Sequence, residues 1–153
     1  FTPSAGSVTI TINPANPNLF RDFDTEFLAT LGHELHHSLR FDGPGYGSTL
    51  RAALVSEGLA CRFETELRTG AGPFYATALS KDQLDEMYKL AQPELDSQTY
   101  NHFDWFFGSY ARKIPRFAGY SLGFSLVEAH MKKTGLSASG LWNSGAEQFF
   151  QNE

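Results

Sequence analysis

The sequence predicts a mainly α-helical fold, and two observations support that prediction. Apolar residues recur at the three- and four-residue spacing of a helix over several long stretches, whereas strict alternation occurs in one short stretch. Helix-capping residues precede the helical stretches, and Gly- or Pro-rich segments follow them. With 153 residues, 41% of them hydrophobic, we expect one domain over residues 1–153 that buries one core.

The alternating stretch lies near the N-terminus and predicts a small strand from Ser7 to Asn13, ended by Pro14 and Pro17. A strand needs a partner, which a preceding segment, a short irregular pairing or a peptide ligand could supply. The chain begins at Phe1 with neither an initiator Met nor a signal peptide, so we expect it to be a piece of a longer protein that lacks an N-terminal segment.

The first helix is expected from Asp22 or Asp24 to Arg40. His33 and His37 lie on one of its faces, and we expect a different, apolar face to make the main core contact, so that both rings point away from the core. That apolar stripe consists of Phe23, Phe27, Leu28, Leu31, Leu35 and Leu39.

A second helix should run back along the first to form an antiparallel hairpin. The Gly- and Pro-rich segment 42–47 ends the first helix and turns the chain. Ser48 or Thr49 can cap the second helix, which we expect to reach Arg68. Further helices are expected over 80–90 with a capping box at Ser80, partly over 96–110, over 115–133 with Gly135 as the stop, after Ser137, and over 147–152.

Charge, hydropathy and cysteine content argue against several classes of protein. The net charge is −5 and Lys and Arg are not clustered, which argues against nucleic acid as a partner. No apolar run approaches the roughly 18 residues of a membrane span. The single cysteine, Cys61, cannot form an internal disulfide, so the sequence requires no oxidising compartment and leans to the cytoplasm without fixing the location.

The stretch His33-Glu34-Leu35-His36-His37 contains the H-E-x-x-H pattern of zinc peptidases. Four residues apart on a helix, the rings of His33 and His37 emerge from one face, where they can share a metal ion. Glu34 would sit beside that ion and accept a proton from its water. Pairing His33 with His36 is geometrically possible, but it would place Glu34 less usefully, so we expect His36 to have a supporting or surface role.

A third metal ligand is expected at Glu57, twenty residues after His37. Glu57 stands about nine residues into the return helix and His33 about eight residues before the turn, so the hairpin brings the two to the same level. Three protein ligands leave the fourth position of a catalytic zinc for water. Gly32 and Gly58, which interrupt good helical sequence beside these ligands, indicate either a close approach at the site or plain small-residue helix packing.

Tyr120 is the candidate donor to the oxyanion that forms when water attacks a carbonyl group. It lies between Gly119 and Gly123, a pair that would let its helix approach a neighbour closely. An ordinary core tyrosine is the alternative. We expect the two remaining histidines, His102 and His130, to take no part in the site.

The combination of His33, His37 and Glu57 with Glu34 as base resembles the gluzincin class of zinc metallopeptidases. The segments 32–38, 54–60 and 119–123 are similar, more closely, to the YjaZ-like group of bacterial predicted zinc-dependent proteases. That resemblance implies a helical metallopeptidase domain with a small strand element near the cleft.

One position departs from the better-known gluzincins. Some of these carry an acidic residue four positions after the metal-binding glutamate, where it orients the first histidine. Here that position is Cys61. The partner of the far nitrogen of His33 is therefore left open between Glu64, a backbone carbonyl and another segment.

Together these patterns predict a peptidase that uses Zn²⁺ as its cofactor and a peptide or protein as its substrate. Two alternatives stay open: a non-catalytic, zinc-stabilised helical domain that binds a partner, and a zinc hydrolase that acts on a non-peptide substrate. In the peptidase, the strand over 8–12 could hold an extended substrate by edge pairing. The sequence determines neither the cleavage preference nor the oligomeric state.

Overall fold

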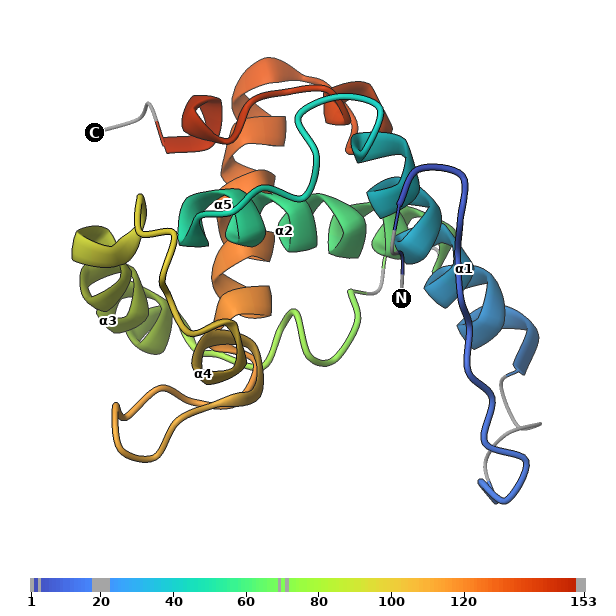
Figure 1. The fold of residues 1–153 in the computed structure, drawn as a ribbon, viewed down its shortest axis with the longest axis horizontal. Helices are drawn as coiled ribbons and strands as arrows, with labels where there is room; N and C mark the ends of the chain where they lie inside the picture. The colour runs from blue at the N-terminus through green and yellow to red at the C-terminus, as the bar shows by residue number, and fades with distance from the viewer. Residues whose placement is uncertain (1, 3, 18–22, 69, 71, 151–153) are drawn as a thin grey trace.

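The computed structural model of the protein describes residues 2, 4–17, 23–68, 70 and 72–150, and it is mainly helical (Figure 1). The α-helices are α1 (Phe23–Arg40), α2 (Leu50–Leu67), α3 (Lys81–Ala91), α4 (His102–Phe107) and α5 (Ala118–Thr134). Short 3-10 helices cover Gln92–Glu94, Ser139–Leu141 and Ala146–Phe150. The predicted bounds are therefore close to those observed, although Asp22 and Asn152 lie outside the described residues.

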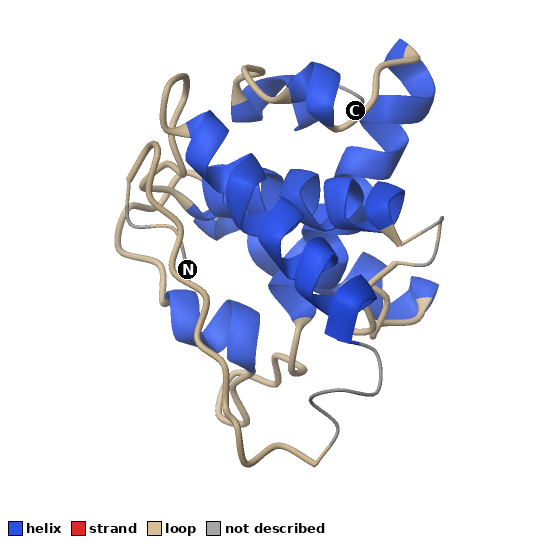
Figure 2. Ribbon diagram, turned by 90° about the vertical axis from the view of Figure 1, so that its right-hand side faces the viewer, coloured by secondary structure: helices blue, strands red, loops and turns tan. Residues whose placement is uncertain are grey.

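The predicted strand from Ser7 to Asn13 is wrong. Among the described residues the only bridge that touches it joins Ser4 to Ser7, and no strand is drawn anywhere in Figure 2. The segment instead runs as a loop tied to α1, where the Gly6 amide donates to Ser38 Oγ at 2.8 Å. Alternating residues make a strand only when a partner completes the ladder, and no described segment pairs with this one.

Helices α1 and α2 form the predicted antiparallel hairpin. The contacts run in opposite chain directions, because Arg40 reaches Ser56 while His33 reaches Glu64. Gly45 and Gly47 in the turn have φ angles of 72° and 87°, a region that favours glycine. The Thr49 side chain then caps α2 by accepting from the Ala52 amide.

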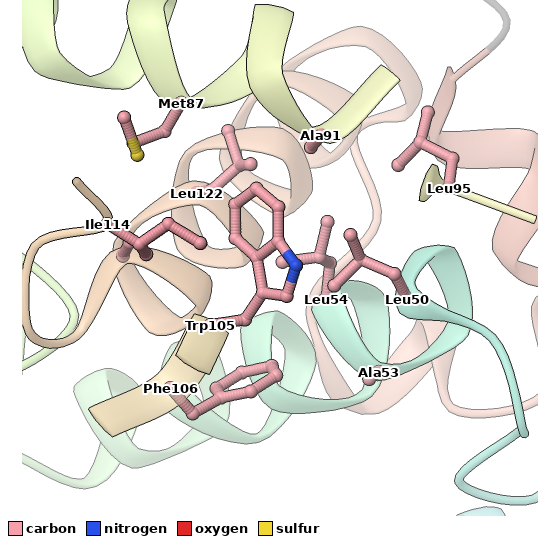
Figure 3. Close-up of a cluster of buried hydrophobic side chains, with 11 residues drawn as sticks. Leu50, Ala53, Leu54, Met87, Ala91, Leu95, Trp105, Phe106, Ile114 and Leu122 are labelled. Atoms are coloured by element: carbon pink, nitrogen blue, oxygen red, sulfur yellow. The ribbon is translucent and has the colours of Figure 1, made fainter. Parts of the chain in front are cut away.

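Helix α5 crosses the opposite side of α2 at very short range. A Cβ atom on Gly58 would lie 2.3 Å from the Gly123 carbonyl oxygen, and one on Gly123 would lie 2.1 Å from the Leu54 carbonyl oxygen. The two backbones are therefore in direct contact, as the predicted small-residue packing requires. Beside this crossing lies an apolar cluster with Trp105 at its middle (Figure 3).

The buried face of α1 is the polar one, which corrects the expectation from the apolar stripe. Leu28, Leu35 and Leu39 are 57%, 49% and 42% exposed, whereas the histidine-bearing face is buried against α2. Hydrogen bonds compensate part of the cost of burying this polar face. The wholly buried Arg40, for example, donates to Ser56 Oγ at 3.3 Å and to the Trp142 carbonyl oxygen at 2.8 Å.

Among the described helices, none combines the length and the apolar character that spanning a bilayer demands.

Candidate metal centre

Helices α1 and α2 bring the three sequence-predicted metal ligands together. His33 and His37 stand one turn apart on α1, and Glu57 faces them from α2. His33 Nε2 lies 3.1 Å from His37 Nε2 and 3.3 Å from Glu57 Oε2. His37 Nε2 lies 3.4 Å from Glu57 Oε1. Two imidazole nitrogens and a carboxylate, all of them atoms that zinc prefers, are thus arranged around one point.

This donor set fits a tetrahedral zinc ion. Ligand atoms bonded at about 2.0–2.1 Å and at tetrahedral angles lie about 3.3 Å from one another. The 3.1 Å between the two imidazole nitrogens is close to that value, and each of these nitrogens has a different Glu57 oxygen at 3.3 or 3.4 Å. In addition, Glu57 Oε2 is buried, and its contact with His33 Nε2 at 3.3 Å is too poorly aligned for a full hydrogen bond. Such an atom is costly unless a cation or a water compensates it.

The electrostatics of the cluster also favour a cation. Burial lowers the pKa of His33, but hydrogen bonds with Cys61, Glu57 and Glu64 outweigh it and raise that pKa well above its usual value. Burial raises the pKa of Glu57, yet His37 and His33 hold it well below its usual range. Acidic groups thus surround the rings on several sides, and a positive charge among them is stabilised.

Glu64 is the partner of the far ring nitrogen of His33, one of the possibilities that the sequence left open. His33 Nδ1 lies 3.2 Å from Glu64 Oε2, and the Glu64 side chain is almost wholly buried. Arg68 fixes that carboxylate, with Nε donating to Oε1 at 2.9 Å, and the Tyr75 hydroxyl donates to Oε2. Arg68 is itself held by Glu26 of α1 at 2.7 Å. The carboxylate therefore fixes the orientation of the imidazole.

A second trio of possible metal ligands, His33, Cys61 and Glu64, shares the ring of His33. Its carboxylate is already bonded by Arg68 and Tyr75, and burial raises the pKa of the Cys61 thiol, which keeps the sulfur protonated. Thiols bind zinc as thiolates. This trio is therefore better described as the support of His33 than as a competing site.

Tyr46, in the turn between α1 and α2, binds the third predicted ligand, Glu57. Its hydroxyl donates to Glu57 Oε1 at 2.9 Å, and its ring lies 5.5 Å from that of His37. Its backbone carbonyl oxygen accepts from Ser56 Oγ at 2.9 Å, which joins the turn to α2. Burial raises the pKa of the Tyr46 hydroxyl and the charge of Glu57 raises it further, so the hydroxyl remains a donor.

Glu34 lies beside the cluster at the edge of a pocket of ≈ 220 Å³ that His33 also lines. Its Oε2 accepts a 2.6 Å hydrogen bond from the Thr2 hydroxyl. The carboxylate is half-buried, whereas the three candidate ligands are buried. The predicted base is thus adjacent to the predicted ligands but placed where a small molecule can reach it.

Tyr120 lines the same pocket from α5. Burial raises the pKa of its hydroxyl, and the charges of Glu57 and Glu34 act in the same direction, so the group stays protonated. Its ring packs on Tyr75 and Phe106, with centroids 5.0 and 4.9 Å away. It is therefore close to the predicted ligands, as expected, and is also part of an aromatic cluster.

The remaining histidines lie outside both ligand trios of the described residues. His36 is buried and pairs through Nε2 with the Ala138 carbonyl oxygen at 3.2 Å, and burial lowers its pKa to about 4. His130 is buried against Phe149, with 4.4 Å between the ring centroids. His102 stacks on Phe106, with 4.3 Å between the ring centroids, and its ring centroid lies 6.1 Å from that of Tyr46.

Sequence reasoning missed Tyr46 and the Tyr75–Arg68 support of Glu64. Tyr46 stands in a glycine-rich turn, where the sequence pattern predicts a change of chain direction but not the contacts of a side chain. Tyr75 lies in a loop, outside any segment with helical periodicity. Glu64 could be found because it is one turn beyond Cys61 and two turns beyond Glu57 on the same face of α2.

Comparison with known proteins was made against families, curated proteins and solved structures. No curated protein and no solved structure matches the chain. Residues 1–151, nearly the whole chain, match the family described as predicted Zn-dependent protease (DUF2268). The buried His–His–Glu cluster and this match agree in pointing to zinc, and the chain belongs to the DUF2268 family of predicted zinc-dependent proteases.

Proposed function

We propose that the protein is a zinc-dependent peptidase of the gluzincin type, in which His33, His37 and Glu57 hold the ion. The observation that supports this most is that the His33 and His37 Nε2 atoms lie 3.1 Å apart and each has a Glu57 oxygen within 3.4 Å, next to a pocket that Glu34 lines. When bound there, zinc supplies a Lewis acid and lowers the pKa of its water to about 7.

In this proposal Glu34 moves the proton. Its Oε2 accepts a hydroxyl hydrogen from Thr2, the same kind of contact that an attacking water would make. The carboxylate accepts the proton of that water and returns it to the leaving nitrogen. Tyr120, which remains protonated, donates to the oxyanion that develops on the scissile carbonyl. Glu64 and Tyr46 act indirectly, since each holds a ligand side chain in place.

Both alternative functions are less well supported. A closed structural zinc site would need a fourth protein ligand, and the cluster found among the described residues has three members. A hydrolase of non-peptide substrates would use the same groups. The family description favours a peptide substrate over that alternative.

The test compares Glu34→Gln with His37→Ala. The first variant removes the base but no ligand, so it should keep about one zinc per chain while hydrolysis of an unstructured protein falls about 10²- to 10⁴-fold. The second removes a ligand and should lose both zinc and hydrolysis. Zinc is measured by atomic emission and cleavage by product analysis. Wild-type turnover in Glu34→Gln, or full zinc in His37→Ala, would contradict the proposal.

A further inference from the structure

We infer that the pocket beside Glu34 and His33 receives one large apolar, preferably aromatic, side chain of the substrate, next to the scissile bond. This inference rests on the proposed function, because it assigns a substrate class to the same site. The pocket adjoins a predicted ligand and the predicted base. A side chain placed in it therefore belongs to a residue adjoining the bond that is cleaved.

The walls of the pocket are aromatic and come from three separate parts of the chain. Tyr75 lies in the loop after α2, Phe107 at the end of α4, Phe117 just before α5 and Tyr120 within α5. Thr30 of α1 completes the rim. Aromatic walls of this kind favour an apolar or aromatic substrate side chain, because its apolar surface is removed from water and its ring can make edge-to-face contacts.

The size of the pocket fits one such side chain. Its volume is ≈ 220 Å³, and a cavity of about 150 Å³ in another protein binds benzene. A single ring therefore fits with some room to spare, whereas a small-molecule cofactor usually needs about 300 Å³ or more.

The backbone at Phe117 supports a role in binding. Phe117 has a φ of 68°, in the left-handed region that bulky residues rarely adopt. In that conformation its ring contacts those of Tyr75 and Tyr120, with centroids 6.2 and 6.3 Å away. Residues held in such conformations concentrate at ligand sites. A glycine would satisfy the turn without strain, so the ring itself accounts for a phenylalanine there.

The charges around the pocket further restrict which substrate side chain it can bind. Glu34 is acidic and lines the pocket, so an acidic side chain would be repelled. A Lys or Arg side chain could stack on the rings, but the Arg116 guanidinium already covers Phe117, 4.5 Å from the ring centroid, and brings a like charge. An uncharged, large side chain meets neither obstacle.

The experiment measures cleavage preference in the zinc-loaded protein. A library of peptides randomised at each position is digested, and products are sequenced. One position beside the cleaved bond should favour Phe, Tyr or Leu over Ala by about 10- to 100-fold in kcat/KM. Phe107→Ala should lower this preference about fivefold or more. Thr30→Phe, which fills the pocket from an exposed helix position, should reverse it toward small side chains.

Phe103→Ala is the matched control. Phe103 stacks on Phe107 at 5.1 Å from one turn earlier in α4, but it does not line the pocket. This variant should keep the wild-type preference. A preference for Lys or Arg, equal cleavage of Phe and Ala peptides, or an unchanged preference in both Phe107→Ala and Thr30→Phe would overturn the inference.

A binding measurement separates this inference from the proposed function. N-acetyl-phenylalanine amide is titrated into zinc-loaded Glu34→Gln and followed by NMR, with N-acetyl-alanine amide as the comparison. The phenylalanine probe should shift the signals of Thr30 and Phe107, and Thr30→Phe should abolish those shifts. If the probe binds in this way but wild type cleaves no peptide, the proposed function fails and the pocket stands. If peptides are cleaved without preference and the probe does not bind, the pocket fails and the peptidase stands.

Discussion

Helix α2 contacts α1 through polar side chains and α5 through apolar side chains and backbone. Toward α1 the helix presents Glu57 and Glu64, which meet buried histidines of α1. Toward α5 it presents Gly58, whose backbone touches that of Gly123, together with leucines of the apolar core. One side therefore carries the chemistry of the candidate site, and the other carries most of the packing that holds the fold.

Burial affects stability in opposite directions on these two sides of α2. At the α2–α5 crossing, burial removes apolar surface from water and stabilises the fold directly. At the α1–α2 contact, burial of polar and charged groups is a cost that hydrogen bonds, and in our proposal a zinc ion, must offset. The leucines of α1 lie on its exposed side for this reason, since its ligand-bearing face has to meet α2.

The first prediction concerns the α2–α5 crossing, where an added methyl group should cause a large loss of stability. Gly123→Ala should lower the free energy of unfolding by about 3 kcal/mol, because the added methyl group meets the Leu54 carbonyl, which is backbone and cannot move aside. Gly140→Ala is the control, since its nearest neighbour would be Ser137 Oγ at 3.4 Å. Denaturant unfolding measures both. A Gly123→Ala protein as stable as wild type would show that the crossing is looser than described.

The next prediction tests whether α5 contributes a catalytic group, Tyr120, as well as packing. Tyr120→Phe should lower kcat about 10²-fold with little change in KM or stability, the loss expected for one oxyanion donor. A tyrosine that serves only the core would instead lose about 1 kcal/mol of stability and leave kcat intact. Steady-state kinetics and thermal unfolding of the same variant decide between the two.

A smaller effect is expected at Glu64, which supports the predicted site through its contact with His33. Glu64→Gln keeps the shape of the side chain but removes the charge that faces His33 Nδ1, so zinc affinity should fall about 10- to 100-fold. Competition with a chromogenic chelator measures the affinity. The control is Glu66→Gln, on the same helix but outside both ligand trios. Equal affinity in wild type and Glu64→Gln would leave Glu64 with a purely structural role.

The smallest effect is expected on the outer face of α1. Leu35→Ala, at a half-exposed position, should change the free energy of unfolding by no more than about 0.5 kcal/mol. Leu54→Ala, the same change at a wholly buried position of α2, should cost about 2–5 kcal/mol. A large loss in Leu35→Ala would mean that this face is covered in solution.

Local signals in the sequence predicted the helices well. The capping box at Ser80, the Thr49 cap and the left-handed Gly135 stop are all present in the structure, near the expected bounds. Each depends on residues within one turn of one another, so sequence alone contains the information. The strand over 7–13 failed because a strand depends on a distant partner, which no alternating pattern supplies.

By itself, the sequence determined the mainly helical fold and the register that places His33, His37 and Glu57 at one level. Only the tertiary structure decided which face of α1 is buried, which side chains hold the ligands, and that four aromatic rings meet beside Glu34. The physical reason is the separation along the chain between the residues that interact. Helical spacing and caps act over a few residues, whereas Tyr46, Tyr75, Phe107 and Phe117 reach the site only because α2 is packed between α1 and α5.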